Sequence, residues 1–215
     1  MKKINYSSAE FALWIDLISK TKGVAAAENY FNHLPPSSKN QMPYGALFNC
    51  YCKEIMSDKA FALFKKIKEL NYLSPLAFNN LMSLYMRMSQ PERVPSLVDE
   101  MKQRNIPLSN VTCSIWMNSY ASLNDIECVE RVYEEINKED NDKVSWNTYS
   151  NLATIYVKAE LFEKAESTLK KLKEEMKPQD RDAYHCLISL YAGTYNLDEV
   201  HRVWKCLGHP LASPT

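Results

Sequence analysis

The stretch "YSNLATIY" (149–156) decides the fold, because its pattern returns five more times in the 215-residue chain. Apolar or small side chains occupy its first, fourth, fifth and eighth places, which lie on one face of an α-helix. The six copies begin at residues 11, 44, 78, 113, 149 and 184, so successive starts differ by 33, 34, 35, 36 and 35 residues. A period of this length predicts a repeat architecture rather than one globular core.

A second helical pattern follows each copy, for example Ala60, Leu63, Phe64 and Ile67 after the copy that begins at residue 44. Stretches rich in Pro, Asn and Ser separate the pairs. We therefore expect an all-α protein, an α-solenoid of six helix-turn-helix repeats of about 35 residues in a right-handed superhelix. The expected repeats are approximately 8–40, 41–74, 75–109, 110–145, 146–180 and 181–209, with tails at 1–7 and 210–215.

Composition argues against several classes of function. Lys and Arg number 26, as do Asp and Glu, so any basic surface must be local. The six cysteines form no C-x-x-C pair, and we expect buried or inert thiols rather than disulfides or a metal site. No apolar run reaches transmembrane length, and no glycine-rich phosphate loop or nucleophile motif occurs. We expect no catalytic residue, metal, cofactor, membrane contact or small-molecule substrate, and the N-terminus leaves no room for a targeting peptide.

The repeats resemble those of the pentatricopeptide repeat family. The stretch "YSNLATIYVKAELFEKAESTLKKLKEEMKPQD" (149–180) is similar to the family consensus, and "FNNLMSLYMRMSQPERVPSLVDEMKQRNIPLS" (78–109) is almost as similar. Bulky residues at the fifth place, such as Phe48 and Met82, disfavour the tetratricopeptide repeat, which has a small residue there. The resemblance covers roughly residues 8–209 and is to the plain repeats of plant organellar proteins. The metal-ligand motifs of the catalytic editing relatives are not found.

The resemblance implies binding of single-stranded RNA, with about one base read per repeat. One base-reading residue directly follows the first aromatic residue of the repeat, and the other ends the repeat. The implied pairs are Asn79 with Ser109, Ser114 with Ser145, and Ser150 with Asp180. The first pair resembles a pyrimidine reader, cytosine in particular, the second is ambiguous, and the third resembles a guanine reader. The alternative is that Asn79 and the serines are ordinary polar residues at helix starts.

Two further positions in the repeat carry an implied role. Leu76 and Val111, three places before a base-reading residue, would wedge between bases. Two places after each eight-residue stretch, a basic residue recurs in four of six repeats and would contact phosphate. These residues are Lys20, Lys53, Arg87 and Lys158. The alternative is that they only solvate an exposed helix face.

Two functions remain open on the sequence alone. The first is a non-catalytic RNA-binding array, with bases along its concave side, acting in the stability, processing or translation of organellar transcripts. The resemblance places it in the mitochondrion, with the plastid as the alternative. The second is a structural scaffold or a protein associated with the mitochondrial ribosome or other organellar proteins, because the concave side of a solenoid also binds peptides. An enzyme is the third class, but no acid–base pair at a defined spacing supports it.

Overall fold

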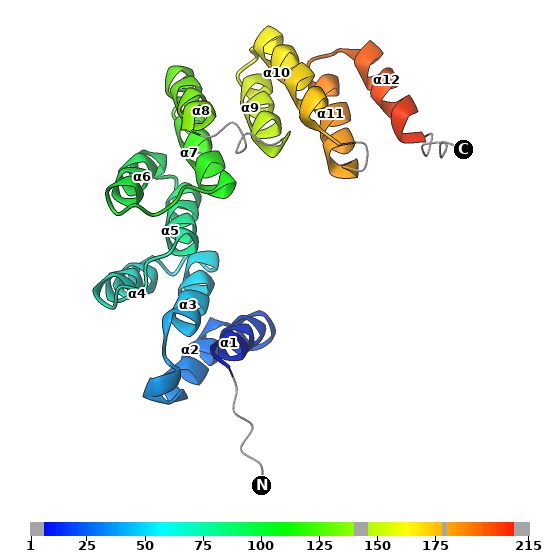
Figure 1. Ribbon diagram of the computed structural model, residues 1–215. Coiled ribbons are helices and arrows are strands. Elements are labelled where there is room, and N and C mark those ends of the chain that lie inside the picture. Colours follow the sequence, from blue (N-terminus) through cyan, green and yellow to red (C-terminus); the bar gives the residue numbers. More distant parts are fainter. Residues whose placement is uncertain (1–6, 140–145, 178–179, 209–215) are drawn as a thin grey trace. The chain divides into compact units, whose positions relative to one another are not determined.

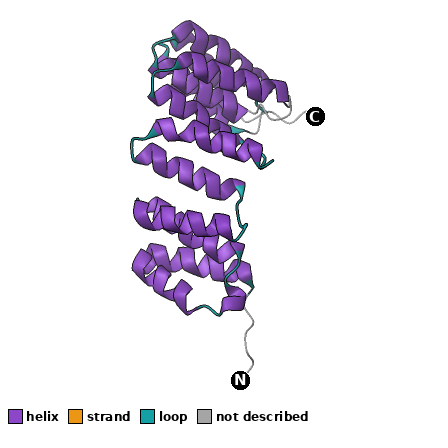
Figure 2. Cartoon of the chain, turned by 90° about the vertical axis from the view of Figure 1, so that its left-hand side faces the viewer, coloured by secondary structure: helices purple, strands orange, loops and turns teal. Residues whose placement is uncertain are grey.

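The computed structural model of the protein describes residues 7–139, 146–177 and 180–208, and within these ranges it contains helices and no strand (Figure 2). Figure 1 labels the α-helices in chain order. They are α1 (Ser8–Lys22), α2 (Val24–His33), α3 (Gln41–Lys53), α4 (Ser57–Glu69), α5 (Pro75–Arg87), α6 (Val94–Gln103), α7 (Asn110–Ser122), α8 (Ile126–Glu139), α9 (Trp146–Lys158), α10 (Phe162–Glu175), α11 (Arg181–Gly193) and α12 (Leu197–Gly208), with the short 3₁₀ helices η1 (Pro36–Ser38) and η2 (Pro91–Arg93). The all-α fold expected from the sequence is confirmed.

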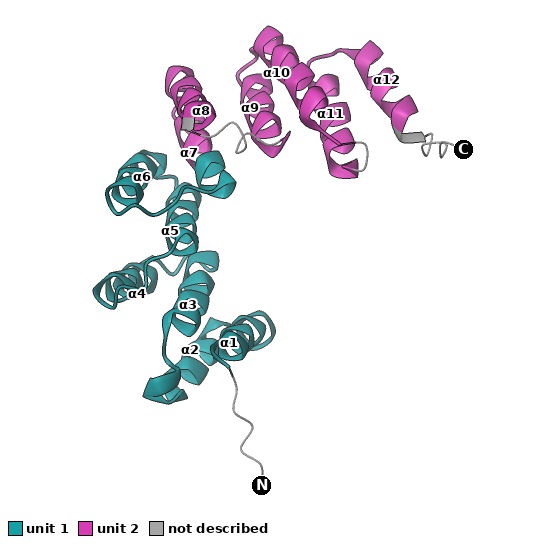
Figure 3. Cartoon of the chain, in the orientation of Figure 1, with its two compact units in different colours: residues 1–115 teal, residues 116–215 magenta. Residues whose placement is uncertain are grey.

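The chain divides into two compact units, unit 1 at residues 1–115 and unit 2 at residues 116–215, and the boundary falls inside α7 (Figure 3). In unit 1 the odd-numbered helices α1, α3 and α5 contact one another in succession. The even-numbered helices α2, α4 and α6 each pack against the helix before them, and α2 and α4 also contact the first helix of the next hairpin. Unit 1 is therefore a stack of helical hairpins.

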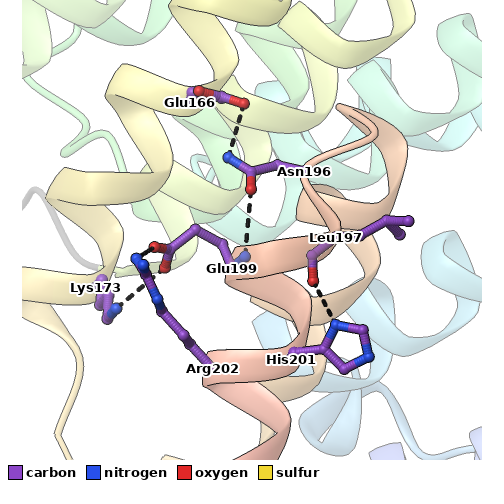
Figure 4. Close-up of polar contacts among 7 residues, drawn as sticks. All are labelled: Glu166, Lys173, Asn196, Leu197, Glu199, His201 and Arg202. Atoms are coloured by element: carbon purple, nitrogen blue, oxygen red, sulfur yellow. Dashed lines mark hydrogen bonds and ion pairs between the residues drawn. The ribbon is translucent and has the colours of Figure 1, made fainter.

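Unit 2 repeats this arrangement with the hairpins α9–α10 and α11–α12, in which α9 and α10 both contact α11. Polar contacts also join α12 to α10, as Figure 4 shows. Asn196 Nδ2 donates to Glu166 Oε1 at 3.0 Å, and Asn196 Oδ1 accepts from the backbone N–H of Glu199 at 3.2 Å. Glu199 also pairs with Lys173 at 3.4 Å and with Arg202. One asparagine thus caps α12 and joins it to the preceding hairpin.

The recurring apolar face forms the core of each unit. The fifth place of the eight-residue stretch is fully buried in five helices, at Ile15, Phe48, Met82, Met117 and Ala153. Aromatic side chains link successive hairpins, because a ring on one even-numbered helix packs on the first-place ring of the next odd-numbered helix. The ring centroids are 5.0 Å apart for Phe31 and Tyr44, 5.6 Å for Phe64 and Phe78, and 6.2 Å for Tyr133 and Tyr149. The sequence period therefore reflects both the core of a hairpin and its contact with the next one.

Two tryptophans on the apolar pattern, Trp14 and Trp204, are less buried than the sequence predicts. The pattern assigns Trp14 and Trp116 to the core, and Trp116 is 6% exposed, but Trp14 is 43% exposed. Among the described helices, α1 packs chiefly against α2 and α3. Trp204 occupies on α12 the place that Phe31 and Phe64 occupy on α2 and α4, yet it is 64% exposed because no described helix follows α12.

The turns inside five hairpins share one geometry. The second residue after each first helix adopts a left-handed backbone, with φ between 54° and 61° at Ile55, Ser89, Asn124, Glu160 and Tyr195. The next backbone N–H then donates to the carbonyl of the eighth-place tyrosine, as from Met56 to Tyr51 and from Leu161 to Tyr156, both at 2.9 Å. This is the pattern of the Schellman motif, achieved here without glycine.

Candidate nucleic-acid interface

Three residues that end expected repeats, Asn40, Ser74 and Ser109, lie directly before odd-numbered helices and cap the N-termini of these helices. Asn40 accepts from the backbone N–H of Met42 at 3.2 Å, and Ser74 accepts from that of Ala77 at 3.2 Å. Ser109 forms a reciprocal pair with Thr112, in which each backbone N–H donates to the other hydroxyl at 3.2 Å. The short polar side chains at this position therefore have a structural reason as well as the base-reading role assigned to them.

Asn79 lies on α5 and is 8% exposed. Its amide bonds to the start of the next hairpin, because Oδ1 accepts from the Thr112 hydroxyl at 2.8 Å and Nδ2 faces Ser109 Oγ at 3.4 Å. The structure thus brings Asn79 and Ser109 together, although they are 30 residues apart in the sequence. Thr112 joins them, and it was not among the residues assigned from the sequence.

The other base-reading positions have different surroundings. Ser114 is partly buried on α7, and its assigned partner Ser145 lies outside the described residues. Ser150 Oγ lies 2.7 Å from Cys186 Sγ on the neighbouring helix α11. Asp180 does not cap α11 through its side chain, and its Oδ2 accepts from the backbone N–H of Lys177 at 3.0 Å. No contact between Ser150 and Asp180 is found among the described residues.

An exposed apolar row runs along the first turns of successive helices in unit 1. Leu76 on α5 is 62% exposed and Val111 on α7 is 58% exposed. Met42 on α3 occupies the same place and is 50% exposed, so it extends the row that the sequence assigned to Leu76 and Val111 alone. Its position three residues before Gly45 was the signal that could have added it. In unit 2 the corresponding residues, Asn147 and Asp182, are exposed and polar.

Three of the four assigned phosphate-binding residues belong to unit 1, and all three are exposed but already engaged. Asp16 lies between two of them, 2.6 Å from Lys20 Nζ and 3.9 Å from Lys53 Nζ. The hydrogen bond and charge of Asp16 raise the pKa of Lys20. Arg87 donates from one nitrogen to the carbonyl oxygens of Cys52 at 3.2 Å and Lys53 at 2.5 Å, at the C-terminus of α3. Its remaining N–H groups are still available to an anion.

Lys158 is exposed at the end of α9 in unit 2. It lines a cavity of about 210 Å³ together with Asn118, Ser122 and Thr154. Asn118 Nδ2 crosses from α7 to α9 and donates to Asn151 Oδ1 at 3.0 Å. This cation therefore has polar neighbours and no carboxylate in its cavity, unlike Lys20 and Lys53.

The cysteines are free thiols, as the sequence predicts. Cys50, Cys52 and Cys113 are buried, and burial raises the pKa of Cys52 to about 12, so this thiol stays protonated at neutral pH. Cys128 and Cys186 are half-buried and Cys206 is exposed, so burial applies to only part of the set. The described residues contain no cluster of three or more groups that could hold a metal ion. Nor is any of their helices long and apolar enough to cross a membrane.

Comparison with known proteins matches most of this repeat array to one family. Models of the PPR repeat match residues 43–72, 111–140 and 147–175, and a model of the PPR repeat family matches residues 73–122. The chain belongs to the pentatricopeptide repeat family. Family membership accounts for the stacked hairpins and for the bulky residues at the fifth place.

Two curated proteins of Arabidopsis thaliana resemble nearly the whole chain. The mitochondrial pentatricopeptide repeat-containing protein At1g02370 is 54% identical over 208 residues, which cover 96% of this chain and 39% of that protein. The large ribosomal subunit protein mL101 (rPPR4) is 42% identical over 206 residues, which cover 95% of this chain and 42% of that protein. The chain thus spans about two fifths of the length of these relatives.

A solved pentatricopeptide repeat structure has the same fold. The crystal structure of PPR10 in complex with an 18-nt psaJ RNA element matches with a TM-score of 0.68 and 18% sequence identity. The match covers 94% of this chain and 30% of that one. At this identity the likeness supports the fold alone.

Proposed function

We propose that this pentatricopeptide repeat chain binds single-stranded RNA without catalysing a reaction. The observation that carries the proposal is the exposed apolar row of Met42, Leu76 and Val111 in unit 1. Exposed apolar side chains at one recurring position gain free energy when they contact the faces of unstacked bases. The cations Lys20, Lys53 and Arg87, in the last turns of α1, α3 and α5, supply the phosphate contacts.

Base reading is assigned to Asn79 with Ser109, to Ser114 with Ser145, and to Ser150 with Asp180. The close approach of Asn79 to Ser109 supports the first pair. A short polar side chain can donate to and accept from the Watson–Crick edge of a base without blocking its approach. The RNA element bound in the crystal structure of PPR10 supports the choice of ligand. The mitochondrial relative At1g02370 supports action on transcripts in that organelle.

A titration of the full chain against labelled single-stranded RNA pools tests the proposal. Fluorescence anisotropy at several salt concentrations gives the affinity and its salt dependence. Four phosphate contacts would give a slope of log affinity against log salt of about −2.8, since each contact to a single strand contributes about −0.7. A duplex of the same sequence is the matched control and should bind more weakly. Absence of binding to the single strands at low salt would reject the proposal.

A second candidate function is association with the mitochondrial ribosome. The specific observation in its favour is the 42% identity to mL101, which is named as a protein of the large ribosomal subunit. It predicts that the native protein sediments with the large subunit in mitochondrial lysate. This co-sedimentation should survive treatment with a nuclease specific for single strands. Sedimentation of the protein as a small particle before nuclease treatment would reject this candidate and leave the first untouched.

A further inference from the structure

Thr112 is the buried residue that holds the side chain of Asn79. It is the third residue of α7 and is fully buried, with a hydroxyl that contacts two residues across the junction of two hairpins. The hydroxyl lies 2.8 Å from Asn79 Oδ1 and 3.0 Å from Ser109 Oγ. Ala77 and Thr148 occupy the corresponding place on α5 and α9 and are also buried.

The hydrogen bonds around Thr112 fix the orientation of the Asn79 amide. The Thr112 oxygen accepts from the backbone N–H of Ser109, and its hydrogen is available for Asn79 Oδ1. The separation of 2.8 Å is typical of an O–H···O bond, whereas an N–H···O bond is usually longer. The longer separation of 3.4 Å, between Asn79 Nδ2 and Ser109 Oγ, suits the N–H group better than a second hydroxyl donor.

This orientation leaves an N–H group of Asn79 for a ligand. The amide nitrogen has two hydrogens, and only one of them faces Ser109. The other has no partner among the described residues, while Oδ1 is occupied by Thr112. Ser109 Oγ is also occupied, because it accepts from the backbone N–H of Thr112 and faces Asn79 Nδ2. Asn79 therefore presents a free N–H donor, while its oxygen already accepts one hydrogen bond.

We propose that Thr112 is a specificity-determining positioning residue, which holds Asn79 so that its N–H selects a base with an acceptor at the centre of the Watson–Crick edge. The inference rests on the proposed RNA-binding function. Cytosine presents an acceptor at N3, whereas uracil presents a donor there. Thr112 thus favours cytosine over uracil at the nucleotide that Asn79 contacts. Without the hydroxyl, the Asn79 amide can turn over, and its freed Oδ1 accepts from the N3–H of uracil.

The test is a comparison of base preference between variants of the full chain. Wild type, Thr112→Val and Thr112→Ser are each incubated with a random single-stranded RNA pool, and the bound sequences give a preference for every nucleotide position. Thr112→Val keeps the shape of the side chain and removes the hydroxyl, and Thr112→Ser keeps the hydroxyl. Thr148→Val is the matched control, because it makes the same change at the same place in another repeat.

We expect wild type and Thr112→Ser to prefer cytosine over uracil about five-fold at one position, as one hydrogen bond would give. Thr112→Val should reduce this ratio to about two-fold or less at that position only, and Thr148→Val should leave it unchanged. A merely structural role would weaken binding to all sequences equally. If Thr112→Val does not fold, as judged by circular dichroism, Thr112→Ala removes the same hydroxyl with a smaller side chain.

Two results would have different meanings. If wild type binds no single-stranded RNA, the proposed function itself is wrong. If wild type binds RNA but Thr112→Val or Thr112→Ala retains the full cytosine preference, the role of Thr112 is wrong and the RNA-binding function stands.

Discussion

The side chains assigned to base reading are held differently in the two units. In unit 1, Asn79 is nearly buried, and its amide is hydrogen-bonded to Thr112 and faces Ser109 at the start of the next hairpin. In unit 2, the Ser150 hydroxyl lies 2.7 Å from the thiol of Cys186 across the same kind of junction. A planar amide with a fixed orientation can distinguish a donor from an acceptor, whereas a rotating hydroxyl can serve as either. We therefore expect one register position to give different selectivity according to what the next hairpin supplies.

The exposed residues near Asn79 and near Ser150 also favour RNA binding by unit 1. Exposed apolar side chains, Leu76 and Val111, occur beside Asn79 in unit 1, but Asn147 and Asp182 occupy the corresponding places in unit 2. A carboxylate repels phosphate, and a short amide contacts a base face less well than leucine does. We therefore expect unit 1 to contribute most of the free energy of RNA binding.

The largest effect should come from the exposed apolar row. The double variant Leu76→Asp/Val111→Asp removes two apolar contacts and adds two negative charges. We expect at least about 30-fold weaker binding to single-stranded RNA, from roughly 2 kcal/mol of lost base contact, measured by anisotropy. The fold should be unaffected, because both side chains are exposed. Asn147→Asp is the control in unit 2, and an equal loss there would remove the distinction between the units.

The next effect concerns the basic residues. Replacing Lys20 and Lys53 by alanine should make the salt slope of binding shallower by about 1.4, since each lost phosphate contact contributes about 0.7. Lys158→Ala in unit 2 should change it by about 0.7 or less. Affinities measured at five salt concentrations give these slopes. An unchanged salt slope in the Lys20→Ala/Lys53→Ala variant would show that Lys20 and Lys53 only solvate the helix face.

The hydrogen bonds of Asn79 should also be visible in stability. Asn79→Ala leaves the buried Thr112 hydroxyl without its acceptor and should cost about 1–2 kcal/mol of the free energy of unfolding. Ser150→Ala should cost about 0.5 kcal/mol or less, because the Ser150 side chain is only partly buried. Urea denaturation followed by circular dichroism compares the two. A smaller loss for Asn79→Ala than for Ser150→Ala would contradict the difference between the junctions.

The smallest expected effect is a gain of affinity. Asp16 pairs with Lys20 and approaches Lys53, so it competes with phosphate for both cations. Asp16→Asn should strengthen RNA binding roughly three-fold at low salt, in line with the modest strength of exposed ion pairs. The gain should disappear in the Lys20→Ala/Lys53→Ala background. A gain that persists there would mean that Asp16 does not act through these lysines.

The sequence predicted the fold well because one period encodes both the hairpin core and the contact between hairpins. It could not predict that Asn79 would be bonded to Thr112, since the two residues are 33 positions apart and meet only when the hairpins stack. Nor did we predict from the sequence that the basic residues would be paired with other groups of the protein. The position of Asp16 one helical turn before Lys20 was a visible signal of their pairing, whereas the contact of Arg87 with the end of α3 required the structure.

The central claim, that RNA lies along the odd-numbered helices of unit 1, is tested most directly by photocrosslinking. The full chain is irradiated with single-stranded RNA that carries 4-thiouridine, and the crosslinked peptides are identified by mass spectrometry. We predict crosslinks in the first turns of α3, α5 and α7, at or beside Met42, Leu76 and Val111. Crosslinks confined to the even-numbered helices, or to α9 and α11 in unit 2, would contradict the account.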